Sequence, residues 1–164
     1  MSSDSPSVSA WMPRERWEAL VRGEGCPVCA EVAGSGQDNS EGYYVADLRV
    51  SRLRLQREQH VPGWCVLLLR RHAREPHELP ERERRAFFDD MMRVGSALER
   101  IYGALKINYQ ILGNIVPHVH AHIQPRFYGD PYPGGPVNPA PGQAVALTDS
   151  EAHEQIVRIR AALV

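Results

Sequence analysis

The segment that most constrains the fold of this chain is His118-Val119-His120-Ala121-His122. In a β-strand, successive side chains point to opposite faces of the sheet, so the three imidazoles would share one face while the apolar residues between them pack into a core. Histidine titrates near neutral pH, and such a face can supply a metal ligand, a nucleophile or a general acid and base. A histidine-rich strand can also be a solvated face or an adventitious metal site. The two-residue spacing and the proline on each side of the run favour a functional site.

Length and composition indicate a single domain. The chain has 164 residues, of which 43% are hydrophobic, enough for one full core. The 19 basic and 20 acidic residues nearly cancel, so no overall field would draw the protein to nucleic acid or to a membrane surface. No run of about 18 apolar residues predicts a membrane-spanning helix. Residues 1–13 are rich in serine and lack the basic and apolar regions of a signal peptide, which predicts a flexible tail on a cytoplasmic protein.

The three cysteines do not suggest a disulfide framework in a reducing compartment. Cys26 and Cys29 form a Cys-x-x-Cys pair, which is half of a tetrahedral zinc site and needs two further ligands, for which histidines are suitable. A thioredoxin-like redox motif and two ordinary buried thiols are the alternatives. Cys65 lies in the apolar segment 63–69, where a thiol behaves as a small hydrophobic group.

Hydrophobic periodicity predicts an α+β fold with an antiparallel sheet of about five strands, one long helix and a C-terminal helix. Apolar residues recur at steps of three and four between residues 80 and 102, as expected for one buried stripe of a long helix. Residues 130–142 contain five prolines and three glycines and cannot form regular structure. Thr148 and Glu151 fit a capping box at the start of the last helix. The predicted helices are 13–22, 80–102 and one from 148, the cysteine pair lies on a knuckle, 34–42 is a polar loop, and the strands are 43–48, 50–56, 64–69, 105–112 and 118–124.

The histidine run and its flanks resemble the histidine triad (HIT) superfamily of nucleotide hydrolases and transferases. Residues 118–124 match its His-φ-His-φ-His-φ-φ signature, where φ is usually apolar and the last position here is Gln124. Residues 62–72 resemble its Pro-Gly-aromatic strand that ends in a basic pair and a histidine. Residues 108–117 resemble the Asn-Tyr…Leu-Gly-Asn-x-x-Pro approach to the triad. The resemblance covers residues 26–126. It suggests a catalytic domain at 14–126, followed by an arm and helix at 127–164.

The resemblance implies covalent nucleotidyl chemistry. The middle histidine is the family's nucleophile, so His120 would attack the α-phosphorus of a nucleotide conjugate and form a nucleotidyl-histidine, from which water releases a nucleoside monophosphate. His122 would contact the phosphoryl oxygens and the leaving group as a donor or an acid. Imidazole is a competent nucleophile at neutral pH, which agrees with this assignment.

The resemblance also implies a structural zinc ion and a homodimer. In zinc-bearing members, two cysteines, the histidine after the basic pair and the first triad histidine bind the metal. Here these residues are Cys26, Cys29, His72 and His118, a closed Cys₂His₂ set without an open position for substrate. The remaining histidines have no motif support and are expected on the surface; they are His60, His77 and His153.

Four polar residues are candidates for substrate binding. Asn108 and Asn114 are amides that can donate hydrogen bonds to phosphate oxygens, although Asn114 is equally suited to a turn. Gln56 stands where the family often has the acidic residue that binds the ribose hydroxyls, and an amide can still bind a diol. Arg126 is a candidate to steady an anionic leaving group.

Two differences between this chain and the family pattern narrow the range of predicted activities. Ile115 stands where phosphoramidase-like members have a hydroxyl residue, which weakens a phosphoramidase interpretation. The uridylyltransferase branch has glutamine as the third triad residue, whereas this chain has His122, which favours hydrolysis. We therefore predict a nucleotidyl hydrolase that acts on a dinucleoside polyphosphate or a related conjugate. A transferase or tailoring enzyme with the same nucleophile and a non-catalytic nucleotide-binding or interaction module are the alternatives.

Overall fold

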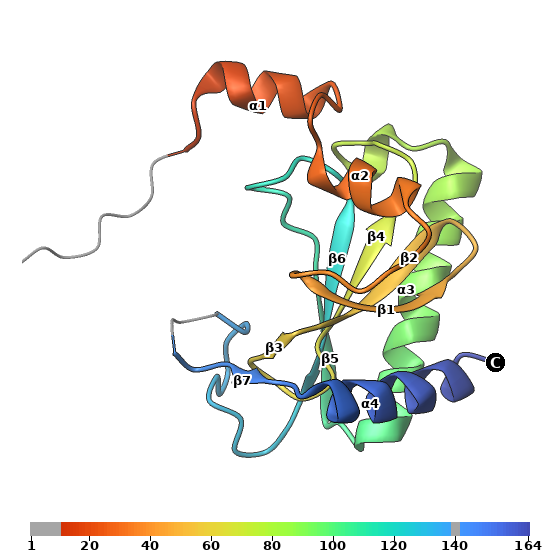
Figure 1. Ribbon diagram of the computed structural model, residues 1–164, viewed down its shortest axis with the longest axis vertical. Coiled ribbons are helices and arrows are strands. Elements are labelled where there is room, and N and C mark those ends of the chain that lie inside the picture. The colour runs from red at the N-terminus through yellow and green to blue at the C-terminus, as the bar shows by residue number, and fades with distance from the viewer. Residues whose placement is uncertain (1–10, 139–141) are drawn as a thin grey trace, which may run out of the picture.

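The computed structural model describes residues 11–138 and 142–164, which form the helices and strands drawn in Figure 1. The expected N-terminal tail and part of the proline-rich segment therefore lie outside the described residues. In chain order the elements are α1 (Arg14–Val21), α2 (Pro27–Ala33), β1 (Gly42–Asp47), β2 (Ser51–Gln56), β3 (Glu58–Gln59), β4 (Cys65–Leu69), the 3₁₀ helix η1 (Pro76–Glu78), α3 (Glu81–Tyr102), β5 (Lys106–Gln110), β6 (His120–Arg126), β7 (Val145–Ala146) and α4 (Asp149–Ala162).

A five-stranded sheet in the order β1-β2-β4-β6-β5 forms the centre of the molecule. Every neighbouring pair of strands is antiparallel. The α+β class and the five-stranded antiparallel sheet expected from the sequence are therefore confirmed. The histidine strand β6 lies between β4 and the edge strand β5, which places the triad next to the middle of the sheet.

The hydrophobic core lies between the sheet and α3. The predicted stripe of α3 is buried, with Phe87, Val94 and Leu98 fully inaccessible to solvent. These side chains share one core with Ala121 and Ile123 of β6 and with apolar residues of α4. Figure 1 shows α4 at the opposite end of the molecule from α2. No helix within the described ranges is both long and apolar enough to cross a membrane.

The structure differs from the predicted elements in several places, among them the start of β6, which begins at His120 and leaves His118 just outside the strand, and the unpredicted 3₁₀ helix η1. The cysteine pair opens a short helix, α2, with Cys26 as its N-cap and Pro27 as its first residue. Strand β5 ends at residue 110, and residues 111–119 approach β6 without regular structure. A two-stranded ladder joins β3 to β7. Two-residue strands are too short to produce a recognisable alternation, so the sequence did not indicate this ladder.

Candidate functional site

Strand β6 directs its imidazoles to one face of the sheet and its apolar side chains to the other, as the alternation predicts. Ala121 and Ile123 are fully buried on the α3 side, whereas His120 and His122 are half-buried on the other face. His122 pairs in register with Val66 of β4 and Gln110 of β5. The ring centroids of the two histidines lie 5.4 Å apart. Two imidazoles are therefore held side by side on a sheet surface.

The ring of His120 has a defined protonation pattern. Its Nδ1 atom lies 2.6 Å from the backbone oxygen of His118. A carbonyl oxygen only accepts hydrogen bonds, so Nδ1 must carry the proton and donate it. In the neutral ring, Nε2 then keeps its lone pair. His120 is thus held as the tautomer that can act as a nucleophile through Nε2.

His122 lies in a site that is largely shielded from water. Burial, with a smaller contribution from His120, lowers the pKa of His122 to about 4. Its Nδ1 atom lies 3.2 Å from the indole Nε1 of Trp64, the residue that precedes β4. His122 is therefore neutral at physiological pH.

Both imidazoles line a cavity of about 730 Å³ between the sheet and α2. This volume is within the range of small-molecule sites. Of the residues predicted to bind substrate, Gln56 lies in the wall of this cavity, and Val66 and Leu68 supply apolar surface. The cavity therefore combines two imidazoles, amide side chains and an apolar wall.

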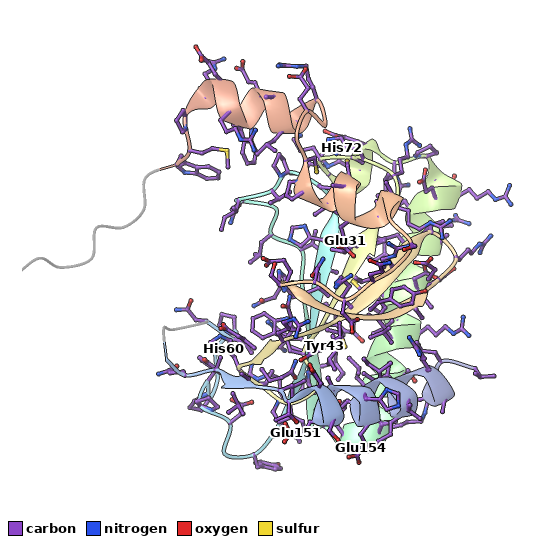
Figure 2. The ribbon with its side chains drawn as sticks, viewed as in Figure 1. Glu31, Tyr43, His60, His72, Glu151 and Glu154 are labelled. Carbon is purple, nitrogen blue, oxygen red and sulfur yellow. The ribbon has the colours of Figure 1, made fainter. Side chains whose placement is uncertain are left out.

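A charged pair from α2 and β2 forms another part of the cavity wall, and the sequence analysis missed it. Arg54 forms an ion pair with Glu31 and donates to Asn39 Oδ1 (3.0 Å) and to the backbone oxygen of Gln37 (3.1 Å). Figure 2 shows Glu31 beneath α2, at the level of the sheet. The alternation of arginines in β2 is the signal that could have identified Arg54, because it directs a cation to the triad face.

Arg126 and Asn108 lie away from this cavity. Arg126 donates through Nε and Nη2 to Asp130 (2.7 and 2.9 Å), through Nη1 to Asn108 Oδ1 (2.6 Å) and the backbone oxygen of Gly135 (2.7 Å), and through Nη2 to the backbone oxygen of Tyr132. All five N–H groups are thus used within the chain. These hydrogen bonds hold the pKa of Asp130 far below its usual range. Arg126 therefore anchors residues 130–135, and its expected role in steadying an anionic leaving group stays a prediction.

Asn108 and Arg126 line a different cavity, of about 930 Å³, beside the edge strand β5. The Asn108 amide nitrogen is not used by Arg126, so a donor remains. Asn114 is exposed in the segment between β5 and β6 and is outside the wall of the triad cavity. The structure therefore brings Gln56 to the triad, but it does not bring together the other three predicted binding residues there.

Gln124 is a buried polar residue that the sequence analysis did not single out. Both amide atoms are inaccessible to solvent and have no hydrogen-bond partner among the described residues. The residue lines a cavity of about 490 Å³ together with Trp64, His122 and Val137. An unpaired buried amide typically costs about 1–3 kcal/mol.

We expect Gln124→Leu to raise the free energy of unfolding by about 1 kcal/mol, because leucine fills a similar volume without an unpaired amide. Thermal unfolding should then shift upward by about 3 °C. Gln110→Leu, on the same face of the neighbouring strand, is the matched control and should not produce this gain. A lower melting temperature for Gln124→Leu would show that the amide is satisfied in solution.

The Cys-x-x-Cys pair lies beside two histidines near the start of β6. The ligand atoms of Cys26, Cys29, His72 and His118 all lie within 4.8 Å of one another. Nδ1 of His118 is 3.4 Å from Cys26 Sγ, 3.5 Å from Cys29 Sγ and 3.2 Å from His72 Nδ1. Figure 2 shows His72 at the α2 end of the molecule and His60 at the opposite end, beside β3.

The donor set fits a tetrahedral metal ion. Zinc with ordinary bond lengths separates its ligand atoms by about 3.3 Å for two nitrogens and about 3.6 Å for nitrogen and sulfur, close to the observed distances. His72 Nε2 is 3.0 Å from the Val21 oxygen and His118 Nε2 is 2.7 Å from the Leu69 oxygen. Each Nε2 must therefore donate to a carbonyl, and each Nδ1 directs its lone pair into the cluster. Two lone pairs that face each other repel unless a cation lies between them.

Burial also suits these residues to metal binding. It lowers the pKa of His118 to about 4, so this ligand is neutral. Burial, together with the adjacent Cys26, raises the pKa of the Cys29 thiol to about 11 without a metal. A bound divalent cation reverses this effect because it stabilises the thiolate. The cluster thus contains imidazole nitrogens that can bind a metal directly and thiols that a bound metal would ionise.

Alternating imidazoles on a central antiparallel strand, beside a Cys₂His₂ cluster, define a histidine triad protein. The chain belongs to the HIT domain family, whose model matches residues 38–129. A histidine triad protein from Bradyrhizobium japonicum is 29% identical, with a TM-score of 0.69 over 76% of this chain and 92% of that chain. No curated protein matches the sequence.

Two further solved structures share the fold. A histidine triad protein from Marinobacter aquaeolei VT8 is 22% identical, with a TM-score of 0.69 over 94% of this chain and 97% of that chain. A zinc-bound histidine triad family protein from Mycobacterium smegmatis is 19% identical, with a TM-score of 0.59 over 84% of this chain and 92% of that chain. Family membership confirms the resemblance drawn from the histidine run.

Proposed function

We propose that the protein is a nucleotidyl hydrolase in which Nε2 of His120 attacks the α-phosphorus of a nucleotide conjugate. The observation that carries this proposal is the hydrogen bond from His120 Nδ1 to the His118 backbone oxygen, which leaves Nε2 with its lone pair. The nucleophile faces a cavity large enough for a nucleoside. Membership of the HIT domain family supports nucleotide binding.

The reaction has two displacements. In the first, a phosphorus–nitrogen bond to His120 forms while the bond from phosphorus to the leaving group breaks. In the second, water oxygen attacks phosphorus, the phosphorus–nitrogen bond breaks, and a nucleoside monophosphate is released. Dividing one displacement into two easier steps is the general gain from a covalent intermediate. His122 hydrogen-bonds to the phosphoryl oxygens or the leaving group, where charge develops in the transition state.

The substrate that we favour is a dinucleoside polyphosphate or a related nucleotide conjugate. Gln56 is the proposed contact to the ribose hydroxyls, because it lines the same cavity as the two imidazoles. Asn108 and Asn114 stay proposed phosphate contacts. Arg126 is a weaker candidate, since each of its N–H groups already has a partner in the chain.

We further propose that Cys26, Cys29, His72 and His118 hold a structural zinc ion. When bound, the metal would fix α2 to the start of β6 without offering an open position to substrate. The Cys₂His₂ geometry supports this assignment, as does the zinc-bound relative from Mycobacterium smegmatis. Reduced thiols suit the cytoplasmic location that we propose.

A homodimer is the proposed assembly. Strand β5 is an edge of the sheet, and exposed apolar side chains lie on it and on α3, among them Tyr109 and Met92. Unpaired edge strands with apolar neighbours are common sites of strand pairing between chains. Size-exclusion chromatography with light scattering measures the assembly directly.

Intact-protein mass spectrometry with product analysis tests the activity. The purified protein is incubated with diadenosine tetraphosphate, an adenosine phosphoramidate and a nucleotide sugar, and samples are quenched during turnover. We expect a nucleoside monophosphate product and a protein species heavier by one nucleotidyl group, both absent in His120→Asn. Nucleotide binding without adduct or product from any substrate would overturn the proposed hydrolase in favour of a binding module.

A further inference from the structure

We propose that Trp64 is a positioning residue that holds His122 as a neutral hydrogen-bond donor, so that catalysis favours leaving groups that depart as weakly basic anions. This inference rests on the proposed function, because it names the class of leaving group that the same site accepts. It concerns whether His122 hydrogen-bonds to the leaving group or protonates it.

Trp64 presents a fixed donor to His122. Its indole Nε1 lies 3.2 Å from His122 Nδ1, and the ring centroids are 5.6 Å apart in an edge arrangement. Trp64 is 7% exposed and packs with Val61 and Val137. The Trp64 backbone N–H donates to Gln59 Oε1 (3.0 Å). These contacts restrain the indole, so the donor cannot easily turn away from His122.

The chemistry of the pair determines the tautomer of His122. An indole N–H donates hydrogen bonds and cannot accept them. Nδ1 of His122 must therefore accept, which places the proton of the neutral ring on Nε2. Protonation of Nδ1 would bring two N–H groups face to face and break the contact. Trp64 thus opposes the imidazolium form through geometry.

The other groups around His122 do not stabilise a cation. His120 faces it from the same strand. Arg54 and Glu31 line the same cavity, but Glu31 is engaged by Arg54 and by Asn39 (2.5 Å). Glu41 also lines that cavity, and His60 lies behind the indole, 5.5 Å from it between ring centroids. No carboxylate in the described parts of the chain hydrogen-bonds to His122.

A neutral His122 restricts the first displacement. As the phosphorus–oxygen bond breaks, the departing oxygen keeps the electron pair and receives a hydrogen bond from Nε2, but no proton, because neutral imidazole is a very weak acid. Phosphate and phenolate groups can depart in this way, whereas alkoxides and amide anions depart slowly. A polyphosphate leaving group fits this restriction. Ile115 supplies no hydroxyl that would protonate an amine.

The tautomer can be measured without any activity. Long-range ¹H–¹⁵N NMR spectra of the full-length, zinc-loaded protein distinguish Nε2–H, Nδ1–H and doubly protonated rings. We expect His122 to stay the neutral Nε2–H form between about pH 5 and pH 8. In Trp64→Phe we expect mixed tautomers and protonation at higher pH, while Trp17→Phe leaves the signal unchanged. An imidazolium or an Nδ1–H ring at pH 7 in the wild type would overturn the proposal, even if the variant fails to fold.

A leaving-group series tests the consequence for catalysis. Adenosine 5′-phosphate aryl esters with phenols of increasing pKa are compared in the wild type and Trp64→Phe. We expect the ratio of rates for the best and poorest leaving groups to shrink about tenfold in Trp64→Phe, because His122 can then act as an acid. Equal dependence on leaving-group pKa in both proteins would contradict the proposal. If neither these esters nor any substrate of the mass-spectrometry panel is turned over, the proposed function fails, and the NMR result still decides the tautomer.

Discussion

Replacing His120 by asparagine is expected to lower kcat by about 10⁴-fold or more, since loss of a nucleophile removes the covalent route. Asparagine can still donate its amide to the His118 backbone oxygen, so the local structure should be preserved. Nucleotide affinity, measured by calorimetry, should change by less than about threefold. The expected pattern is therefore a loss of turnover without a loss of binding.

Two further variants complete this experiment. His122→Asn should retain more activity than His120→Asn, with a loss of about 10²-fold to 10³-fold, because it removes one stabilising donor and leaves the nucleophile in place. His153→Asn, on the exposed face of α4, is the control for histidine replacement and should retain wild-type activity. Nucleotidyl adduct formation in His120→Asn would show that another residue is the nucleophile.

Removing one ligand of the Cys₂His₂ cluster is expected to have the largest effect on stability. In Cys29→Ser we expect loss of bound zinc and a decrease of about 3 kcal/mol or more in the free energy of unfolding, which corresponds to about 10 °C in Tm. The reason is that both histidines would still direct lone pairs into the cluster while the cation that relieves their repulsion is gone. Elemental analysis and thermal unfolding measure the two effects.

Cys65→Ala is the matched control, because Cys65 is fully buried in the core but is not part of the cluster. It should be less stable than the wild type and still bind one zinc per chain. A chelator should lower the Tm of the wild type and Cys65→Ala, with little further effect on Cys29→Ser. Equal zinc content in Cys29→Ser and the wild type would refute the assigned site.

The sequence predicted the parts of the site that local periodicity determines. Strand alternation places His120 and His122 on one face, and that geometry needs no knowledge of the rest of the fold. The partners of Arg126 could not be predicted in the same way. Apart from Asn108, they are backbone oxygens and a carboxylate in residues 130–135, whose conformation depends on glycines and prolines rather than on a repeating pattern. A sequence does not distinguish an arginine whose hydrogen-bond partners lie within its own chain from one whose N–H groups are free to bind a substrate.

Tertiary contacts account for the other omissions. Trp64 was recognised as part of an apolar strand, but its hydrogen bond to His122 depends on the register between β4 and β6. Glu31 and Arg54 form an ion pair because α2 packs over the sheet. The sequence analysis placed the cysteine pair on a knuckle and therefore did not predict the short helix α2. Gln56 lines the triad cavity, whereas Asn108 lies in another cavity and accepts a hydrogen bond from Arg126 through Oδ1.

The strict alternation of β6 also constrains how this protein can evolve. An insertion or deletion of a single residue within the strand would send the imidazoles into the hydrocarbon core and bring Ala121 and Ile123 to the surface. Catalytic change within β6 is therefore limited to substitutions in place. The segments on either side, residues 111–117 and 127–138, have no strand alternation to preserve, so a change in their length does not reverse the two faces of the sheet. New substrate preferences in descendants of this chain should accordingly be sought in the length and sequence of those flanking segments.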